Sequence, residues 1–214
     1  MSVISPAILA ETPDEYKMQI DKVQPFAERI QIDISDGIFT PNFLINAQQI
    51  WWPKECLADI HAIVQQPAQH LQALISLKPN MVIFHAEAEG DLLQMFAYLK
   101  QYGIKAGVAL LRPTVPSKVE AYIKEADHVM IFSGDLGKYG GTASLMQLEK
   151  VRLIKKINPE AEIGWDGGVN LDNAYTLTQG GVNVLNVGGA IQNADNPQIM
   201  YKRLVDEINK QGVI

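Results

Sequence analysis

The feature that most constrains this chain is a regular alternation of two kinds of segment. Short runs rich in apolar and β-branched residues recur along all 214 residues, and amphipathic stretches of helical length separate them. Strands joined by helices favour a parallel sheet, because parallel neighbours need a long crossover connection that a hairpin turn cannot supply. We expect strands at Val3–Leu9, Ile30–Ile34, Leu57–Val64, Met81–His85, Lys105–Leu110, His128–Phe132, Glu162–Asp166 and Val184–Gly188.

The number of these runs predicts a closed (β/α)8 barrel, the TIM barrel, which has eight parallel strands. A doubly wound open sheet shows the same alternation, but its usual five or six strands leave two runs unplaced. Because no linker or low-complexity tract breaks the chain, we expect a single domain over residues 1–214. The expected helices are Pro13–Glu28, Pro67–Leu77, Asp91–Tyr102, Val115–Glu125, Leu145–Ile157, Asn173–Gln179 and Gln198–Lys210.

Composition and charge indicate which partners and which cell compartment to expect. The net charge is −6, and no clustered basic face is visible, so we expect no nucleic-acid partner, since such binders neutralise phosphates with clustered positive charge. No basic segment is followed by a long apolar run, so neither a secretion signal nor a membrane span is predicted. Together with the lone thiol of Cys56, which fits a reducing compartment, this predicts a cytoplasmic protein.

Polar residues close several of the predicted strands at the same end. Asp33 ends the second strand, His61 the third, His85 the fourth and Asp166 the seventh. Taken singly, each has a simpler interpretation, because such an aspartate is often a cap and a lone histidine is often a core residue. Functional groups of a TIM barrel, however, gather at the carboxyl ends of its strands. We therefore predict the reactive centre there, with His85 among its substrate contacts.

Three glycine pairs follow the last three strands. Gly140-Gly141 lie in the long loop after the sixth strand, Gly167-Gly168 follow the seventh and Gly188-Gly189 follow the eighth. Glycine pairs are common in turns, but missing side chains also let backbone N–H groups approach an anion. TIM barrels often bind phosphate after strands seven and eight. The position of the pairs therefore predicts a phosphate-binding cup.

Six segments resemble the signature segments of ribulose-phosphate 3-epimerases, in order and spacing, over nearly the whole chain. The most specific of them ends at Pro41-Asn42. The resemblance implies a TIM barrel of the ribulose-phosphate-binding type and an assembly of two or more copies. The segments are Ile4–Leu9, Ile32–Asn42, Asp59–His61, Ala106–Val108, Asp166–Asn170 and Gly188–Ile191.

The resemblance also implies site roles. Asp33 and Asp166 would be the catalytic acid and base on opposite faces of a small phosphorylated ketose. The same two residues and His61 would hold a divalent metal, with Zn, Fe, Mn and Co all open, and His61 would also contact the substrate. The family's further metal-binding histidine is replaced here by Gln31, whose amide oxygen is a poorer zinc ligand than imidazole, so Gln31 is the doubtful ligand.

The leading interpretation is therefore an isomerase that epimerises a ketose phosphate, such as ribulose 5-phosphate, beside its carbonyl. Two alternatives stay open. A sugar-phosphate lyase on the same barrel would need a cation near the reacting carbon, and Lys138 in the altered sixth loop is the candidate that the sequence offers. A phosphosugar-binding protein without turnover is suggested by Gln31 and by Ala7, which replaces a family serine.

Overall fold

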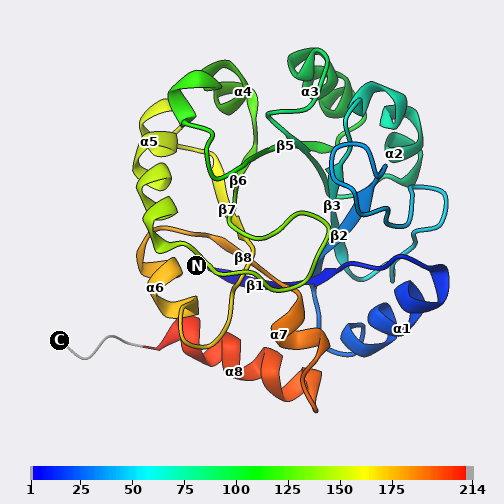
Figure 1. The fold of residues 1–214 in the computed structure, drawn as a ribbon, viewed down its shortest axis with the longest axis vertical. Helices are drawn as coiled ribbons and strands as arrows, with labels where there is room; N and C mark the ends of the chain where they lie inside the picture. The colour runs from blue at the N-terminus through cyan, green and yellow to red at the C-terminus, as the bar shows by residue number, and fades with distance from the viewer. Residues whose placement is uncertain (1, 211–214) are drawn as a thin grey trace.

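Eight parallel strands close into a barrel in the computed structural model, which describes residues 2–210 (Figure 1). Each strand pairs with its neighbour in sequence order, and β8 pairs with β1 to close the ring. The predicted TIM barrel is confirmed, and every predicted strand lies within one residue of an observed one at each end. The strands are β1 Val3–Ile8, β2 Arg29–Ser35, β3 Leu57–Ile63, β4 Met81–His85, β5 Lys105–Leu110, β6 His128–Phe132, β7 Glu162–Asp166 and β8 Val184–Val187.

Helices form the outer ring around these strands (Figure 1). Three predicted helices begin as short 3-10 turns, namely η1 Pro67–Gln69, η2 Pro116–Lys118 and η3 Leu145–Leu148. The α-helices are α1 Pro13–Val23, α2 Leu71–Leu77, α3 Leu92–Gln101, α4 Glu120–Glu125, α5 Glu149–Ile157, α6 Ala174–Gln179, α7 Gly189–Gln192 and α8 Pro197–Asn209. Within residues 2–210, none of the helices is long and apolar enough to cross a membrane.

Two helix predictions need correction. The helix expected over Pro13–Glu28 stops at Val23, because Pro25 has no N–H to donate to the next helical hydrogen bond. Helix α7 was not among the expected helices, because a single turn in a glycine-rich loop carries no helical periodicity. The expectation of one domain over residues 1–214 includes residues 1 and 211–214, which lie outside the described part of the chain.

Strand alternation separates the apolar core from the polar interior of the barrel. On β2, Ile30, Ile32 and Ile34 pack outward in the core shared with the helices. Gln31 and Asp33 alternate with them and face inward, because successive side chains of a strand point to opposite faces. A small separate apolar cluster fills the middle of the barrel, formed by Met81, Ile83, Ala109 and Met130.

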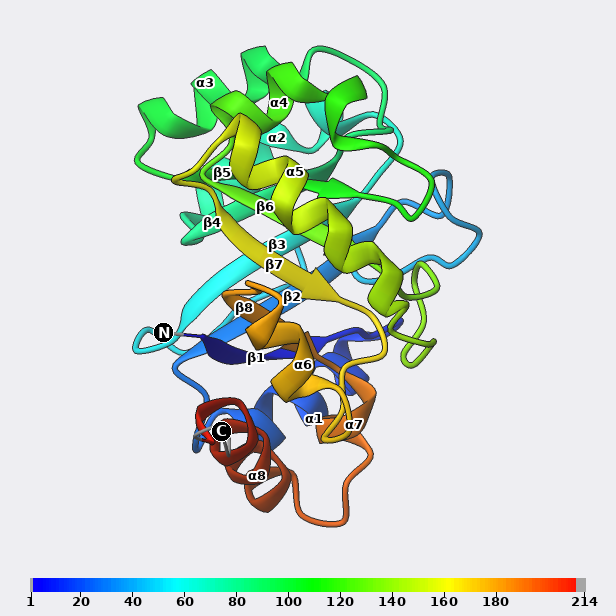
Figure 2. The ribbon, with the colours of Figure 1, turned by 90° about the vertical axis from the view of Figure 1, so that its left-hand side faces the viewer.

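Ion pairs close the barrel at the amino-terminal ends of its strands. Arg29 of β2 donates from Nε to Asp59 on β3 over 2.6 Å, and from its two terminal nitrogens to Glu162 on β7 over 2.9 and 2.8 Å. His128 Nδ1 of β6 lies 2.8 Å from the same Glu162 carboxylate. The loops after β2, β6 and β7 lie at the opposite end of the barrel (Figure 2). The functional site is therefore expected at that end.

Candidate active site

Four inward-facing residues meet at the carboxyl ends of β2, β3 and β7. Strand register places Asp33 directly opposite His61. One ligand atom each from Asp33, His61 and Asp166 lies within 4.8 Å of the others. The structure thus brings together the predicted catalytic aspartates and the predicted metal ligands, with Gln31 between them.

The side-chain amide of Gln31 bridges the two aspartates. Its Nε2 donates to Oδ1 of Asp33 over 2.8 Å and to Oδ2 of Asp166 over 2.5 Å. Its Oε1 is buried and has no hydrogen-bond partner among the described residues. The residue that departs from the family pattern is therefore in direct contact with both carboxylates.

Burial controls the protonation of the aspartate pair. It raises the pKa of Asp33 to about 7, against the lowering effect of the hydrogen bond from Gln31. Burial and the nearby charge of Asp33 raise the pKa of Asp166 to about 7 as well. Carboxyl groups with pKa values near the working pH can both take up and release protons, which is the property that general acid and base catalysis needs.

Two buried histidines lie behind the aspartates. His61 Nδ1 is 3.2 Å from Oδ1 of Asp33, and its Nε2 is 2.8 Å from Nε2 of His85. Burial lowers the pKa of each histidine to about 4, so both rings are neutral at pH 7. His85 Nδ1 faces Oε2 of Glu87 at 3.5 Å.

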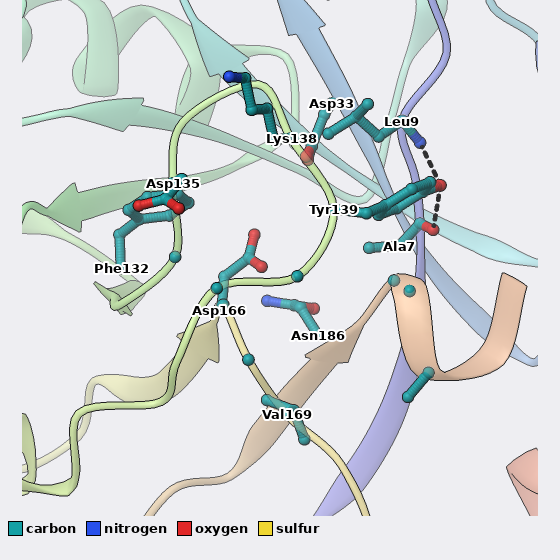
Figure 3. Close-up of a pocket in the computed structure, with 18 of the residues that line it drawn as sticks. Ala7, Leu9, Asp33, Phe132, Asp135, Lys138, Tyr139, Asp166, Val169 and Asn186 are labelled. Atoms are coloured by element: carbon teal, nitrogen blue, oxygen red, sulfur yellow. Dashed lines mark hydrogen bonds between the residues drawn. The ribbon is translucent and has the colours of Figure 1, made fainter. Parts of the chain in front are cut away.

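A cavity of about 290 Å³ opens beside the aspartates, beneath the loop that follows β6 (Figure 3). Asp166 and Asn186 point into it from the ends of β7 and β8 (Figure 3). His61 and His85, which the sequence predicts to contact the substrate, are buried and do not line this cavity. All the predicted cup glycines do line it: Gly140, Gly141, Gly167, Gly168, Gly188 and Gly189.

Two glycines of this wall, Gly167 and Gly168, are required by space. A Cβ atom on Gly167 would lie 2.0 Å from the backbone nitrogen of Gly134, and one on Gly168 would lie 2.3 Å from that of Ala143. Both glycines also have positive φ angles, of 105° and 72°, which residues with side chains rarely adopt. The bare backbone that the sequence predicts for an anion site is therefore present.

The loop of residues 133–144 crosses the mouth of the barrel (Figure 1), and contacts of Tyr139 and Leu136 hold its middle part. The Tyr139 hydroxyl accepts a hydrogen bond from the Leu9 N–H over 2.8 Å and donates to Oε1 of Gln19 on α1. Nearer β6, the Leu136 carbonyl accepts from Asn42 Nδ2 over 3.1 Å. Both contacts join the loop to residues in the first part of the sequence, between Leu9 and Asn42.

Sequence reasoning missed two residues of this site. Asn186 closes β8 as Asp33 closes β2, so the rule applied to the other strand ends would have found it. Tyr139 stands directly before the Gly140-Gly141 pair, but nothing in the sequence indicates that its hydroxyl reaches β1.

The donor set fits a divalent cation. Two carboxylates and one imidazole converge, and three protein ligands with a remaining open position are usual for a catalytic metal site. Gln31 turns its NH₂ group toward both carboxylates, so its buried and unpartnered Oε1 would reach a cation held there only after the amide rotates. Hard cations accept such oxygen ligands better than zinc does, so the residues present fit a hard divalent cation best.

Comparison with known proteins places the chain in a family. The model of the ribulose-phosphate 3 epimerase family matches residues 3–192. The chain belongs to this family. Its members are carbohydrate-phosphate epimerases, enzymes of the isomerase class, so the predicted family and enzyme class are confirmed.

Its relatives named ribulose-phosphate 3-epimerase match over most of their length but at low identity. The Helicobacter pylori (strain 26695) protein is 27% identical over 196 residues, covering 88% of this chain and 89% of its own length. The Bacillus subtilis protein is 27% identical over 201 residues, covering 89% of this chain and 92% of its own length. The Schizosaccharomyces pombe protein is 22% identical over 214 residues, covering 97% of this chain and 94% of its own length.

Solved structures agree with the fold. The 3-hexulose-6-phosphate synthase from Salmonella typhimurium has a TM-score of 0.72 at 16% identity, covering 97% of this chain and 98% of that one. KGPDC from Streptococcus mutans has a TM-score of 0.71 at 11% identity, covering 97% of each chain. Because identities this low carry the fold alone, the chemistry has to be argued from the site.

Proposed function

We propose that this chain epimerises a ketose phosphate, ribulose 5-phosphate or a related phosphosugar, at the carbon next to the carbonyl. Asp33 and Asp166 act as the acid and base. The observation that carries this proposal is the pair of aspartates with raised pKa values that line one cavity with the glycine cup. Family membership supports the same reaction class.

Two carboxyl groups suit an inversion at carbon. One aspartate, ionised, removes the proton from the carbon beside the carbonyl, and the other, protonated, returns a proton to the opposite face. Each turnover leaves the pair with one proton in total, moved from one aspartate to the other. Gln31 supports the exchange because its two N–H groups contact both carboxylates and fix their separation.

A divalent cation held by Asp33, His61 and Asp166, with Gln31 as the doubtful fourth ligand, would stabilise the negative charge that develops on the substrate's carbonyl oxygen. The glycine cup would bind the phosphate through backbone N–H groups, since no side chain there blocks the approach of an anion. Binding the phosphate at one end of the cavity orients the sugar carbons toward the aspartates at the other end.

The test is solvent-deuterium incorporation into ribulose 5-phosphate and a small panel of ketose phosphates. We expect exchange in the wild type, and a loss of roughly 10²- to 10⁴-fold in both Asp33→Asn and Asp166→Asn, the range of general acid and base catalysis. Asp206→Asn, an exposed carboxylate on α8, is the matched control and retains full exchange. Exchange that survives in either site variant would overturn the assigned roles.

The same assay separates the remaining alternatives. Treatment with EDTA lowers exchange when a metal assists. Exchange that resists EDTA but disappears in Lys138→Ala would replace the metal with the Lys138 ammonium, which also lines the cavity. Binding of ribulose 5-phosphate without exchange, even with added Mn²⁺, would instead indicate a phosphosugar-binding protein, and cleavage of the sugar would indicate a lyase.

A further inference from the structure

A buried chain of side chains runs from the catalytic centre to β4 and the residues just after it. Asp33 contacts His61 at 3.2 Å, His61 contacts His85 at 2.8 Å, and His85 faces Glu87 at 3.5 Å. Both imidazoles are completely buried. Besides His61, the aromatic rings around His85 are Phe39 and Phe132, which offer no oxygen or nitrogen for a hydrogen bond.

When Asp33 is ionised, as it is when it binds a cation, the hydrogens of this chain cannot satisfy all of its contacts. Two neutral imidazoles carry one N–H each, so three successive contacts share two hydrogens. In one arrangement, His85 donates to His61 and His61 donates to Asp33, which leaves His85 Nδ1 and the Glu87 carboxylate facing each other without a hydrogen. In the other, His61 donates to His85 and His85 donates to Glu87, which leaves His61 Nδ1 bare beside the two aspartates.

Glu87 favours the second arrangement. Its Oε1 accepts from the Leu111 N–H over 3.0 Å and from the Thr114 hydroxyl. Its Oε2 is buried and, like Nδ1 of His85, lacks a partner at hydrogen-bond distance. A carboxylate can only accept, so an N–H on His85 Nδ1 is the one change that satisfies both of these buried atoms.

We propose that Glu87 is a positioning residue that acts through His85 to keep His61 Nδ1 free of hydrogen and so makes His61 a metal ligand. This inference rests on the metal-assisted function proposed above. Metal-binding histidines usually donate their second ring N–H to a partner that fixes the tautomer. Here that partner is His85. It can accept the N–H of His61 only if its own hydrogen is on Nδ1, where the Glu87 carboxylate accepts it.

The variant Glu87→Gln should reverse the donor and acceptor roles along this row of hydrogen bonds. The Leu111 N–H still requires an acceptor, so the glutamine turns its carbonyl oxygen toward Leu111 and its NH₂ group toward His85. His85 Nδ1 must then accept, His85 Nε2 donates to His61, and the hydrogen of His61 moves to Nδ1. That hydrogen occupies the lone pair that a cation needs.

Two readouts test this directly. Nitrogen-15 NMR of the imidazoles reports which ring nitrogen of His61 carries hydrogen, and isothermal titration of metal-free protein with Zn²⁺ reports affinity. We expect His61 to carry hydrogen on Nε2 in the Zn²⁺-loaded wild type and on Nδ1 in Glu87→Gln. We expect the variant to bind Zn²⁺ roughly 10- to 100-fold more weakly, the usual effect of losing such a partner.

The matched control is Glu89→Gln, which removes the same charge two residues away at an exposed side chain bonded to Gln65 and Gln66. It keeps the wild-type tautomer and affinity. An unchanged His61 tautomer in Glu87→Gln, or an affinity equal to that of Glu89→Gln, overturns the inference. If the wild type binds no divalent cation, the metal-assisted function fails, and the same His61 tautomer in metal-free wild type and Glu87→Gln then refutes the relay as well.

Discussion

At the scale of single residues, Gln31 separates this chain most clearly from the pattern of its family. Its amide donates to the carboxylates of Asp33 and Asp166, a contact that neutralises no charge but keeps the two groups together. An imidazole at this position would present a nitrogen lone pair, which zinc prefers to an amide oxygen. The side chain of residue 31 should therefore control which cation the site selects.

We expect Gln31→His to bind Zn²⁺ about tenfold more tightly than the wild type, equivalent to about 1.4 kcal/mol. Isothermal titration of metal-free protein measures the change. The control is Gln48→His, which adds a histidine at an exposed position away from the aspartates. Equal Zn²⁺ affinities in the wild type and Gln31→His would show that residue 31 is not a ligand.

At the scale of elements, the loop after β6 covers the cavity, and its middle part is fastened through Tyr139 and Leu136. The Tyr139 hydroxyl accepts from the N–H of Leu9, directly after β1, and lies 3.2 Å from the carbonyl oxygen of Ala7 in β1. The ring of Tyr139 also lies close against Gly188, where a Cβ atom would come within 2.4 Å of it. Because the proposed phosphosugar substrate would have to pass this loop, its fastening should limit access to the cavity.

We expect Tyr139→Phe to loosen the loop while leaving the barrel intact. Losing the two hydrogen bonds of this hydroxyl costs about 1 to 2 kcal/mol, which raises the open population roughly 5- to 30-fold. Limited proteolysis with trypsin, which cuts after Lys138, should proceed faster by about that factor. The control is Tyr98→Phe, whose hydroxyl lies on the surface of α3. Equal cleavage rates in the two variants would remove Tyr139 from this role.

At the scale of the whole molecule, the sequence was sufficient for the barrel and for the residues at its strand ends. The alternation of β2 is visible in the sequence. Ile30 and Ile32 pack outward against the helices, whereas Gln31 and Asp33 face the polar interior of the barrel. The cup glycines were also predictable, since their place after known strands fixes which end of the barrel they reach.

The contacts that could not be predicted join segments far apart in the chain. Tyr139 meets Leu9, and Glu87 faces His85 while being held by Leu111 and Thr114. Such pairs depend on how a loop folds back over the barrel, and no sequence period records that path. The sequence thus indicated which polar residues gather at the carboxyl ends of the strands, whereas the structure is needed to see what positions them.

The ion-pair network of Arg29, His128 and Glu162, at the end of the barrel away from the aspartates, should make the stability of the fold depend on pH. Burial raises the pKa of Glu162, but the hydrogen bonds from Arg29 and His128 outweigh burial and hold that pKa well below its usual value of 4.5. A carboxyl group whose pKa is lower in the folded state stabilises the fold above its unfolded pKa. This stabilisation is lost as the pH falls through the folded value.

We therefore expect Glu162→Gln to lower the melting temperature most at pH 7, and the difference from the wild type to shrink as the pH falls below about 4.5. Thermal unfolding followed by circular dichroism from pH 7 to pH 3 measures it. Glu160→Gln removes an exposed carboxylate from the preceding turn and should leave the melting temperature unchanged throughout. A difference independent of pH would mean that Glu162 acts by packing, because only an ionised carboxylate can lose its contribution on protonation. Since the network lies at the end of the barrel away from the aspartates, the variant should keep its solvent-exchange activity at 25 °C, which separates the stabilising end from the reactive one.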